Sequence, residues 1–166
     1  MPGSAADNLR QIPPAPGTYV LVLACARRDA LRIGRLGVLS ICPGFYVYVG
    51  SAFGPGGLAA RLGRHLRGGA ARPHWHIDFL RAHAEPVEVF WCEGVRQEHR
   101  WAARIGELPG ATSPLAGFGA SDCTCRSHLF YFHQRPSGVT LGRNLGGLNV
   151  APTASGRGEA GPEGAG

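Results

Sequence analysis

The stretch Gly44–Ala52, "GFYVYVGSA", decides how the chain is read, because aromatic and β-branched residues alternate in it as they do in a strand. Successive side chains of a strand point to opposite faces, so Tyr46 and Tyr48 share a face with Gly50. The other face carries the apolar residues Phe45, Val47 and Val49 and is predicted to be core. The tyrosine face ends at a residue without a side chain, which would leave room for a ligand beside the backbone.

A basic helix is predicted directly after this strand, in "FGPGGLAARLGRHLR". Arg61, Arg64 and His65 are spaced i, i+3, i+4 and therefore line one face of that helix. An arginine guanidinium matches the geometry of a phosphate and keeps its proton at physiological pH. The pattern is typical of a phosphate-binding surface, and equally of a solvated basic face.

Composition supports one domain with a polyanionic partner. The chain has 166 residues, of which 44% are hydrophobic, so it can bury a core. All 17 basic residues are arginine, and the formal net charge is +6. A basic domain of this size makes nucleic acid the first expected partner.

Five cysteines occur, and neither a secretory signal nor an apolar run of about 18 residues is found. We therefore expect a cytoplasmic protein that does not span a membrane, with its cysteines as thiols or metal ligands.

The order of elements predicts a small α+β domain, with helices against a central antiparallel sheet. The expected strands are 17–25, 30–41 (one bent strand or two short ones, with Gly34 and Gly37 as candidate bulges), 45–52, 87–93 and 127–133. The first three are expected to form an antiparallel meander. The expected helices are 57–68, 74–83 and 96–108. We expect residues 1–15 to be a flexible arm, 16–145 the domain, and 146–166 a disordered Gly/Ala/Pro-rich tail.

Two short motifs carry a family resemblance. "GTY" at 17–19 and "YVG" at 48–50 resemble the paired motifs of the GIY-YIG nucleases. The segments "LRIGRLGVLSI", "GSAFGPGGLAARLGRHLR", "HWHIDFL" and "FGASDCTCRSHLFYF" resemble the Uri-type subfamily, which also occurs fused to base-excision glycosylases. The resemblance covers residues 16–133.

The resemblance implies a GIY-YIG-like fold and a metal-dependent endonuclease that hydrolyses DNA in repair or processing. The catalytic residues it implies are Tyr19, Tyr48, Arg61, His65 and Glu98. Glu98 would bind a single Mg²⁺ or Mn²⁺ ion. The residues expected to contact substrate are Gly17, Gly50, Ser51 and Arg64.

Several alternatives stay open. A free tyrosine has a pKa of about 10, so His65 competes with Tyr19 as the general base. The supporting asparagine of the wider family has no clear counterpart; Asn144 and Asn149 do not align, and Ser121 or Asp122 could fill its place. The chain could also be a nucleic-acid-binding module that has lost catalysis, and the sequence does not separate DNA from RNA.

A zinc-stabilised interaction domain is a third reading. Cys123, Cys125 and His128 offer suitable donors. The spacing is poor, since there is no second cysteine pair, and His74 and His76 would point apart on a helix. Zinc is therefore disfavoured, and Trp75 and Trp101 are expected to anchor the core.

Overall fold

A five-stranded antiparallel sheet forms the centre of the computed structural model, which describes residues 10–68 and 72–152. The strand order is β6-β4-β1-β5-β7. The strands are β1 (Gly17–Cys25), β4 (Gly44–Ala52), β5 (Glu85–Glu93), β6 (Leu129–Phe132) and β7 (Asn149–Pro152). The α+β class predicted from the sequence is confirmed.

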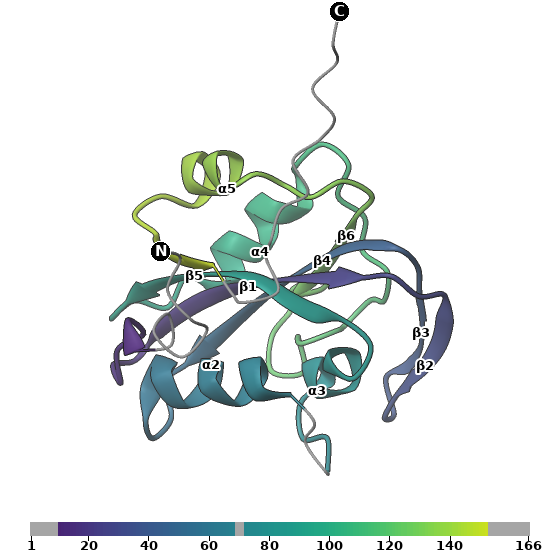
Figure 1. Cartoon of the computed structure of the whole chain (residues 1–166), viewed down its shortest axis with the longest axis horizontal. Coiled ribbons are helices and arrows are strands. Elements are labelled where there is room, and N and C mark those ends of the chain that lie inside the picture. The colour runs from purple at the N-terminus through teal and green to yellow at the C-terminus, as the bar shows by residue number, and fades with distance from the viewer. Residues whose placement is uncertain (1–9, 69–71, 153–166) are drawn as a thin grey trace, which may run out of the picture.

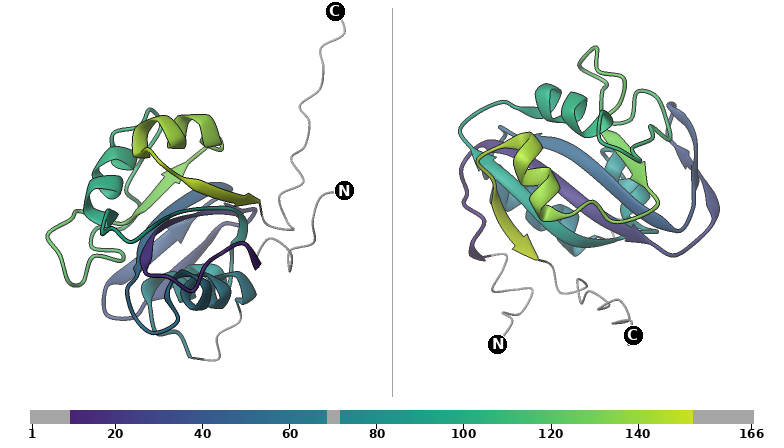
Figure 2. Two further views of the ribbon diagram at one scale, coloured as in Figure 1. Left: turned by 90° about the vertical axis from the view of Figure 1, so that its left-hand side faces the viewer. Right: turned by 90° about the horizontal axis from the view of Figure 1, so that it is seen from above.

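Helices cover both faces of this sheet (Figures 1 and 2). The face that carries Tyr19, Leu21 and Tyr48 packs against α2 (Gly57–Arg67) and α3 (His76–Arg81). The opposite face carries valines and packs against α4 (Glu98–Gly106) and α5 (Gly138–Leu145). The alternation of side chains along β1 and β4 thus supplies two separate hydrophobic cores.

The predicted three-stranded meander is wrong in its connectivity. β1 pairs directly with β4 over nine residues, from Gly17↔Ala52 to Cys25↔Gly44. The segment between them forms a separate hairpin of β2 (Asp29–Ile33) and β3 (Gly37–Ile41). The hairpin is stabilised by four leucine and isoleucine side chains that join the α2/α3 core: Leu31, Ile33, Leu39 and Ile41.

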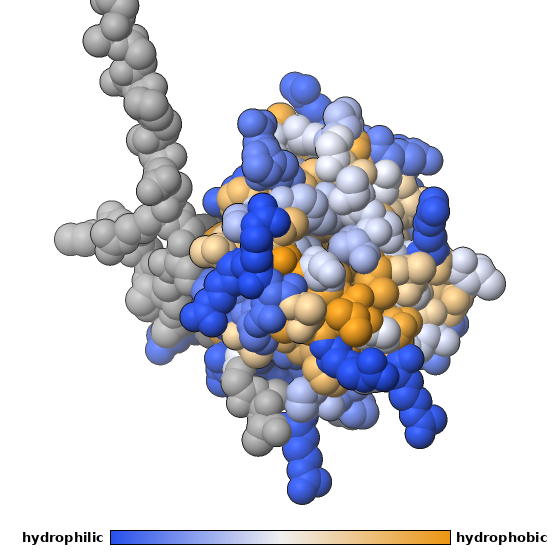
Figure 3. Space-filling view, turned by 90° about the vertical axis from the view of Figure 1, so that its right-hand side faces the viewer, coloured by the Kyte–Doolittle hydropathy of each residue, from blue (hydrophilic) through white to orange (hydrophobic). Residues whose placement is uncertain are grey.

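Gly34 lies in the turn of this hairpin, with φ 49°, and Gly37 opens β3 opposite Ile33, with φ 133°; neither is a bulge, because the β2–β3 register is continuous. Seen from the hairpin side of the molecule, apolar side chains gather near the middle of the surface with hydrophilic ones around them (Figure 3).

The folded body is larger than predicted at both ends. Ile12 is buried, and the carbonyl groups of Pro13 and Ala15 accept hydrogen bonds from Ala59 and Leu58 at the start of α2. Residues 10–15 therefore provide acceptors for N–H groups that lack partners within the helix, instead of forming a flexible arm.

Two elements near the C-terminus were not predicted. Helix α5 begins after Ser137, whose side chain accepts a hydrogen bond from Thr140 N. Strand β7, within the predicted disordered tail, pairs with Glu88–Trp91 of β5. The rest of the predicted arm and tail, residues 1–9 and 153–166, lies outside the described residues.

In the described ranges, no helix combines the length and apolar character needed to cross a membrane.

Candidate active site

The candidate site lies where β4 extends past β6, its neighbour at the edge of the sheet. β6 pairs with Phe45–Tyr48 only, so β4 continues beyond it as Val49–Ala52. A cavity of about 520 Å³ opens at this point. It is lined from β4, both helical layers and the loop before β6, by Tyr48, Val49, Gly50, Ser51, Arg61, His74, Trp75, His76, Arg96, Glu98, His99, Gly119, Ser121, Asp122, Cys123 and His128.

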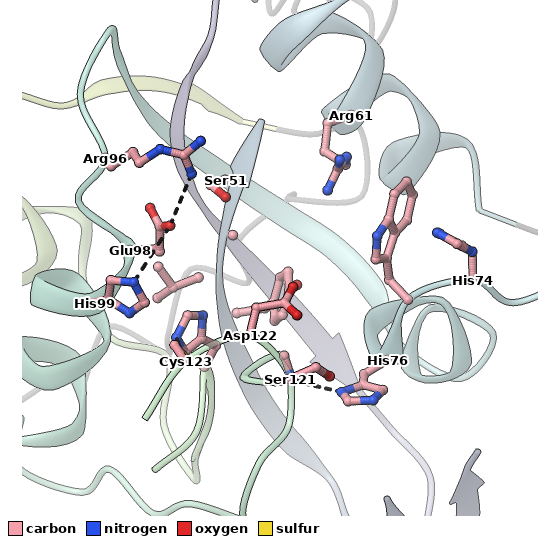
Figure 4. A pocket seen from close by; sticks show the side chains of 16 residues that line it. Ser51, Arg61, His74, His76, Arg96, Glu98, His99, Ser121, Asp122 and Cys123 are labelled. Carbon is pink, nitrogen blue, oxygen red and sulfur yellow. Dashed lines mark hydrogen bonds and ion pairs between the residues drawn. The ribbon is translucent and has the colours of Figure 1, made fainter. Parts of the chain in front are cut away.

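Five of the residues predicted from the sequence line this pocket: Tyr48, Gly50, Ser51, Arg61 and Glu98. Arg61 comes from α2 and Glu98 from α4, which cover opposite faces of the sheet. Figure 4 shows them on either side of the end of β4, with Ser51 between them. The stretch of β4 beyond β6, which pairs only with β1, is thus where side chains from both layers meet.

Tyr19 and His65 lie beneath the pocket and do not line it. Both are buried, and Tyr19 Oη is 2.7 Å from His65 Nε2. The ring centroids of Tyr19 and Tyr48 are 6.2 Å apart, so the buried pair lies directly behind a tyrosine that lines the cavity.

Position 50 needs a residue without a side chain for a different reason from the one predicted. It stands opposite Tyr19 in the β1–β4 register, and a Cβ atom at position 50 would overlap the phenol ring and hydroxyl of Tyr19. The space beside the backbone is therefore filled by Tyr19 rather than kept free for a ligand.

Two predicted substrate contacts lie outside the pocket. Gly17 is buried, and a Cβ there would overlap the carbonyl of Cys92 on β5, so this glycine allows close strand packing. Arg64 donates through Nη2 to Asp78 Oδ2 at 3.0 Å and lies over Trp75.

Trp75 orients the arginines of α2. The guanidinium carbon of Arg61 lies 4.0 Å from the centroid of the Trp75 ring, and that of Arg64 lies 4.6 Å from it. Such cation–π contacts fix a long side chain in one direction. Trp75 is thus half-buried beside the pocket, whereas Trp101 is the fully buried core anchor that was predicted.

Asp78 holds the backbone at Trp75 in place through hydrogen bonds. Its Oδ2 accepts hydrogen bonds from the backbone N–H groups of His74 (2.8 Å) and Trp75 (3.0 Å), besides Arg64. Burial opposes ionisation of this carboxyl group, but the two backbone donors and Arg64 outweigh it and lower its pKa.

Glu98 presents a buried carboxylate to the pocket. Its side chain is about one-tenth exposed, with Oε1 at 3.8 Å from Arg96 Nη1 and 4.0 Å from His99 Nε2. The other oxygen, Oε2, is buried and has no hydrogen-bond partner among the described residues. A buried carboxylate oxygen without a donor fits a ligand for a hard divalent cation.

Burial also determines the protonation of the aromatic cluster. It raises the pKa of Tyr48 to about 12, raises the pKa of Tyr19 well above its ordinary value, and lowers the pKa of His65 to about 4. At neutral pH both tyrosines are protonated and His65 is neutral. Tyr19 Oη and His65 Nε2 therefore share a hydrogen bond between two neutral groups, and the rings of Tyr48 and Trp75, which line the pocket, pack against His65.

A second group of side chains, three of which line the same pocket, could hold a metal ion. The donor atoms of His99, Cys123, Cys125 and His128 all lie within 4.8 Å of one another. The sequence reasoning against zinc considered His74 and His76 and so missed His99, which the fold brings to Cys125 across 26 positions. His74 and His76 instead line the pocket, and His76 Nδ1 accepts from Gly119 N at 2.9 Å.

Ser121 and Asp122 line the pocket, whereas Asn144 and Asn149 do not. Asn144 donates to Thr140 O within α5. Sequence reasoning missed Arg96 and His99 as pocket residues, although both neighbour Glu98 and could have been found from that adjacency.

Comparison with known families places the chain in one of them. The model of the family described as "Domain of unknown function DUF123" matches residues 18–145, and the chain belongs to this family. No curated protein and no solved structure matches the chain at a significant level.

Proposed function

We propose that this protein is a divalent-metal-dependent endonuclease that hydrolyses phosphodiester bonds in DNA. The observation that carries the proposal is that Tyr48, Arg61 and Glu98, from three separate elements, line one pocket. Tyr19 and His65 lie directly beneath it. These are the five residues that the GIY-YIG resemblance selects. A role in DNA repair or processing rests on the resemblance alone.

Arg61 is the residue expected to bind the phosphate. Its guanidinium stacks on Trp75 at 4.0 Å and lies in the pocket, where its donors can reach the non-bridging oxygens of a phosphodiester. It would stabilise the charge that develops on the phosphoryl group. Arg96 adds a second positive charge on the Glu98 side of the same cavity.

Glu98 is the residue expected to hold the metal ion, since its Oε2 has no hydrogen-bond partner in the described part of the chain. One carboxylate completed by water and substrate oxygens is a normal Mg²⁺ or Mn²⁺ site, and Asp122 offers another carboxylate in the same pocket. When bound, such an ion supplies charge stabilisation for the leaving 3′ oxygen.

The buried aromatic cluster would handle the proton of the attacking water. Tyr48 is the phenol that lines the pocket, and it is protonated at neutral pH, so it orients water as a hydroxyl group and not as a phenolate. His65 is neutral at this pH and is hydrogen-bonded through Nε2 to Tyr19, so it can accept a proton. His65 is therefore a proton acceptor one step removed from the pocket.

The same pKa values favour a second candidate, a nucleic-acid-binding module without catalysis. Neither tyrosine is a ready base, because burial keeps both phenols protonated. This candidate keeps the basic pocket and predicts salt-sensitive binding without cleavage.

The test is a nicking panel with single-stranded, duplex and branched DNA, and RNA counterparts, in Mg²⁺, Mn²⁺ or chelator. We expect metal-dependent nicking of at least one DNA substrate. Arg61→Gln should reduce it about 10²- to 10³-fold, as expected for loss of an electrostatic stabiliser.

The matched control is Arg104→Gln, which removes one positive charge from an exposed position on α4 away from the pocket and should leave nicking unchanged. Binding without nicking on every substrate would support the binding module. Nicking of RNA alone would contradict DNA as the substrate and assign RNA in its place.

A further inference from the structure

His99, Cys123, Cys125 and His128 come together from three parts of the chain. His99 is the second residue of α4, Cys123 and Cys125 lie in the loop before β6, and His128 directly precedes β6. His99 Nδ1 is 2.9 Å from Cys125 Sγ, and Cys123 Sγ is 3.5 Å from His128 Nε2. All four donor atoms lie within 4.8 Å of one another.

These distances suit a single ion at the centre of the group. Zinc binds Cys sulfur at about 2.3 Å and His nitrogen at about 2.0–2.1 Å, so ligand atoms at the corners of a tetrahedron are about 3.3–3.8 Å apart. Adjustments of about an ångström, chiefly in the exposed His99 and the half-buried Cys123 and Cys125 around the buried His128, would bring the four donors to that geometry.

The donor types select the metal. Two thiolates and two imidazoles are ligands for zinc, whereas Mg²⁺ and Mn²⁺ prefer carboxylate and water oxygens. Four protein ligands also complete the coordination of zinc, which is typical of a structural site. The group thus differs in chemistry from the Glu98 carboxylate beside it.

A disulfide between Cys123 and Cys125 is the competing use of the two thiols. In the structure both are free, and each sulfur faces a histidine nitrogen. The two thiols also interact with each other, but the two imidazoles beside them supply the further donors that a metal ion needs and a disulfide does not.

The position of the group indicates what an ion would do. Residues 113–128, all of them described, form a loop without helix or strand. Ser121 and Asp122 of this loop line the pocket, and Glu98 precedes His99 on α4. An ion held by His99 and the loop cysteines would therefore fix the loop wall of the pocket against the start of α4.

We propose that His99, Cys123, Cys125 and His128 bind a structural Zn²⁺ ion that ties the loop 113–128 to α4 beside the candidate active site. His99 would coordinate through Nδ1, which leaves Nε2 directed at Glu98 Oε1, 4.0 Å away. Carboxylates near the second nitrogen of a zinc-bound histidine are a recurrent arrangement.

The first experiment measures the zinc content of the untagged full-length chain, purified under reducing conditions. We expect about one zinc ion per chain, and loss of that zinc in the double variant Cys123→Ser/Cys125→Ser. The control Cys42→Ser/Cys92→Ser changes two half-buried cysteines outside the group and should keep the zinc.

The second experiment needs no variant and so does not depend on how well one folds. Co²⁺ added to metal-free protein should give the visible spectrum of a tetrahedral site with two thiolates, and Zn²⁺ should abolish it. Mg²⁺ should not compete.

Three results would overturn the proposal. These are a reduced chain that binds no Zn²⁺ or Co²⁺, zinc that the double variant retains in full, and a native disulfide that leaves only three of the five cysteines titratable as thiols. None of these readouts uses nicking, so the zinc site can fail or succeed independently of the proposed nuclease activity.

Discussion

Tyr19 and Gly50 are matched in size across the β1–β4 pair. Tyr19 is fully buried on β1, and its phenol occupies the space that the missing side chain of Gly50 leaves on β4. Strand alternation in the sequence was enough to place Tyr48 and Gly50 on one face. The sequence could not show that a residue 31 positions earlier fills the gap, because that depends on the register between two strands.

The burial of His65 was likewise beyond the sequence. Its spacing from Arg61 places both on one helix face, but the two side chains have different environments: Arg61 lines the pocket, and His65 is 2% exposed. Helical periodicity predicts the face of the helix on which a side chain lies, but not how deeply that side chain is buried. A residue near the boundary between core and surface can therefore be either buried or exposed.

We predict a pH dependence of stability from His65. Its pKa is about 4 in the folded protein, mainly because of burial, against about 6.5 when unfolded. The unfolded chain therefore binds more protons in this range, and the stabilisation present above pH 6.5 is lost as the pH falls through 4. The expected loss in the free energy of unfolding is about 2 kcal/mol between pH 7 and pH 4.5, measured by urea denaturation at pH 7, 5.5 and 4.5.

His65→Gln is the comparison, because glutamine does not titrate in this range. Other buried histidines contribute to both proteins, so the difference between the two pH profiles isolates His65. Parallel profiles for the two proteins would contradict the burial of a neutral His65.

At the scale of elements, the start of α3 determines the position of Trp75. Asp78 accepts hydrogen bonds from two backbone N–H groups and from Arg64, and so joins α3 to α2. A helix in this segment was predicted, but its role in holding the Trp75–Arg61 stack was not, since that role depends on the packing of α2 against α3.

We predict that Asp78→Ala destabilises the protein by about 1–3 kcal/mol, because it leaves donors without their acceptor. It should also weaken DNA binding, because Trp75 no longer holds Arg61. Urea unfolding and DNA-binding titration measure the two effects.

Glu85→Ala serves as the control. Glu85 also pairs with an arginine, Arg81, at 3.4 Å, but its side chain is 67% exposed. An exposed pair contributes about 0–1 kcal/mol, so this variant should keep both stability and DNA binding. Equal effects of the two substitutions would contradict a special role for Asp78.

The hairpin β2–β3 shows why connectivity was harder to predict than class. Its two strands were expected, as an alternative to one bent strand, and short turns favoured pairing with their chain neighbours. The structure instead pairs β1 with β4 and leaves the hairpin apart. Local sequence could not predict which strands pair, because the pairing depends on which apolar faces pack into the same core.

At the scale of the whole molecule, the site is made by a sheet whose edge strand is only partly covered. β6 ends opposite Tyr48, and the uncovered end of β4 is reached by α2 from one face and α4 from the other. The sequence identified Arg61 and Glu98 through the family resemblance. That helices on opposite faces bring them to one pocket is a property of the fold.

The most direct test of Glu98 as the metal ligand of an active site is the single-turnover nicking rate of Glu98→Gln in Mg²⁺, measured beside the wild-type chain. We predict a decrease of about 10²-fold or more, because the amide cannot replace a carboxylate ligand in binding and charge stabilisation. Glu107→Gln, an equal charge change at an exposed position that follows α4, should match the wild-type rate. A Glu98→Gln protein that nicks DNA as fast as wild type would contradict the assignment of this pocket as the active site.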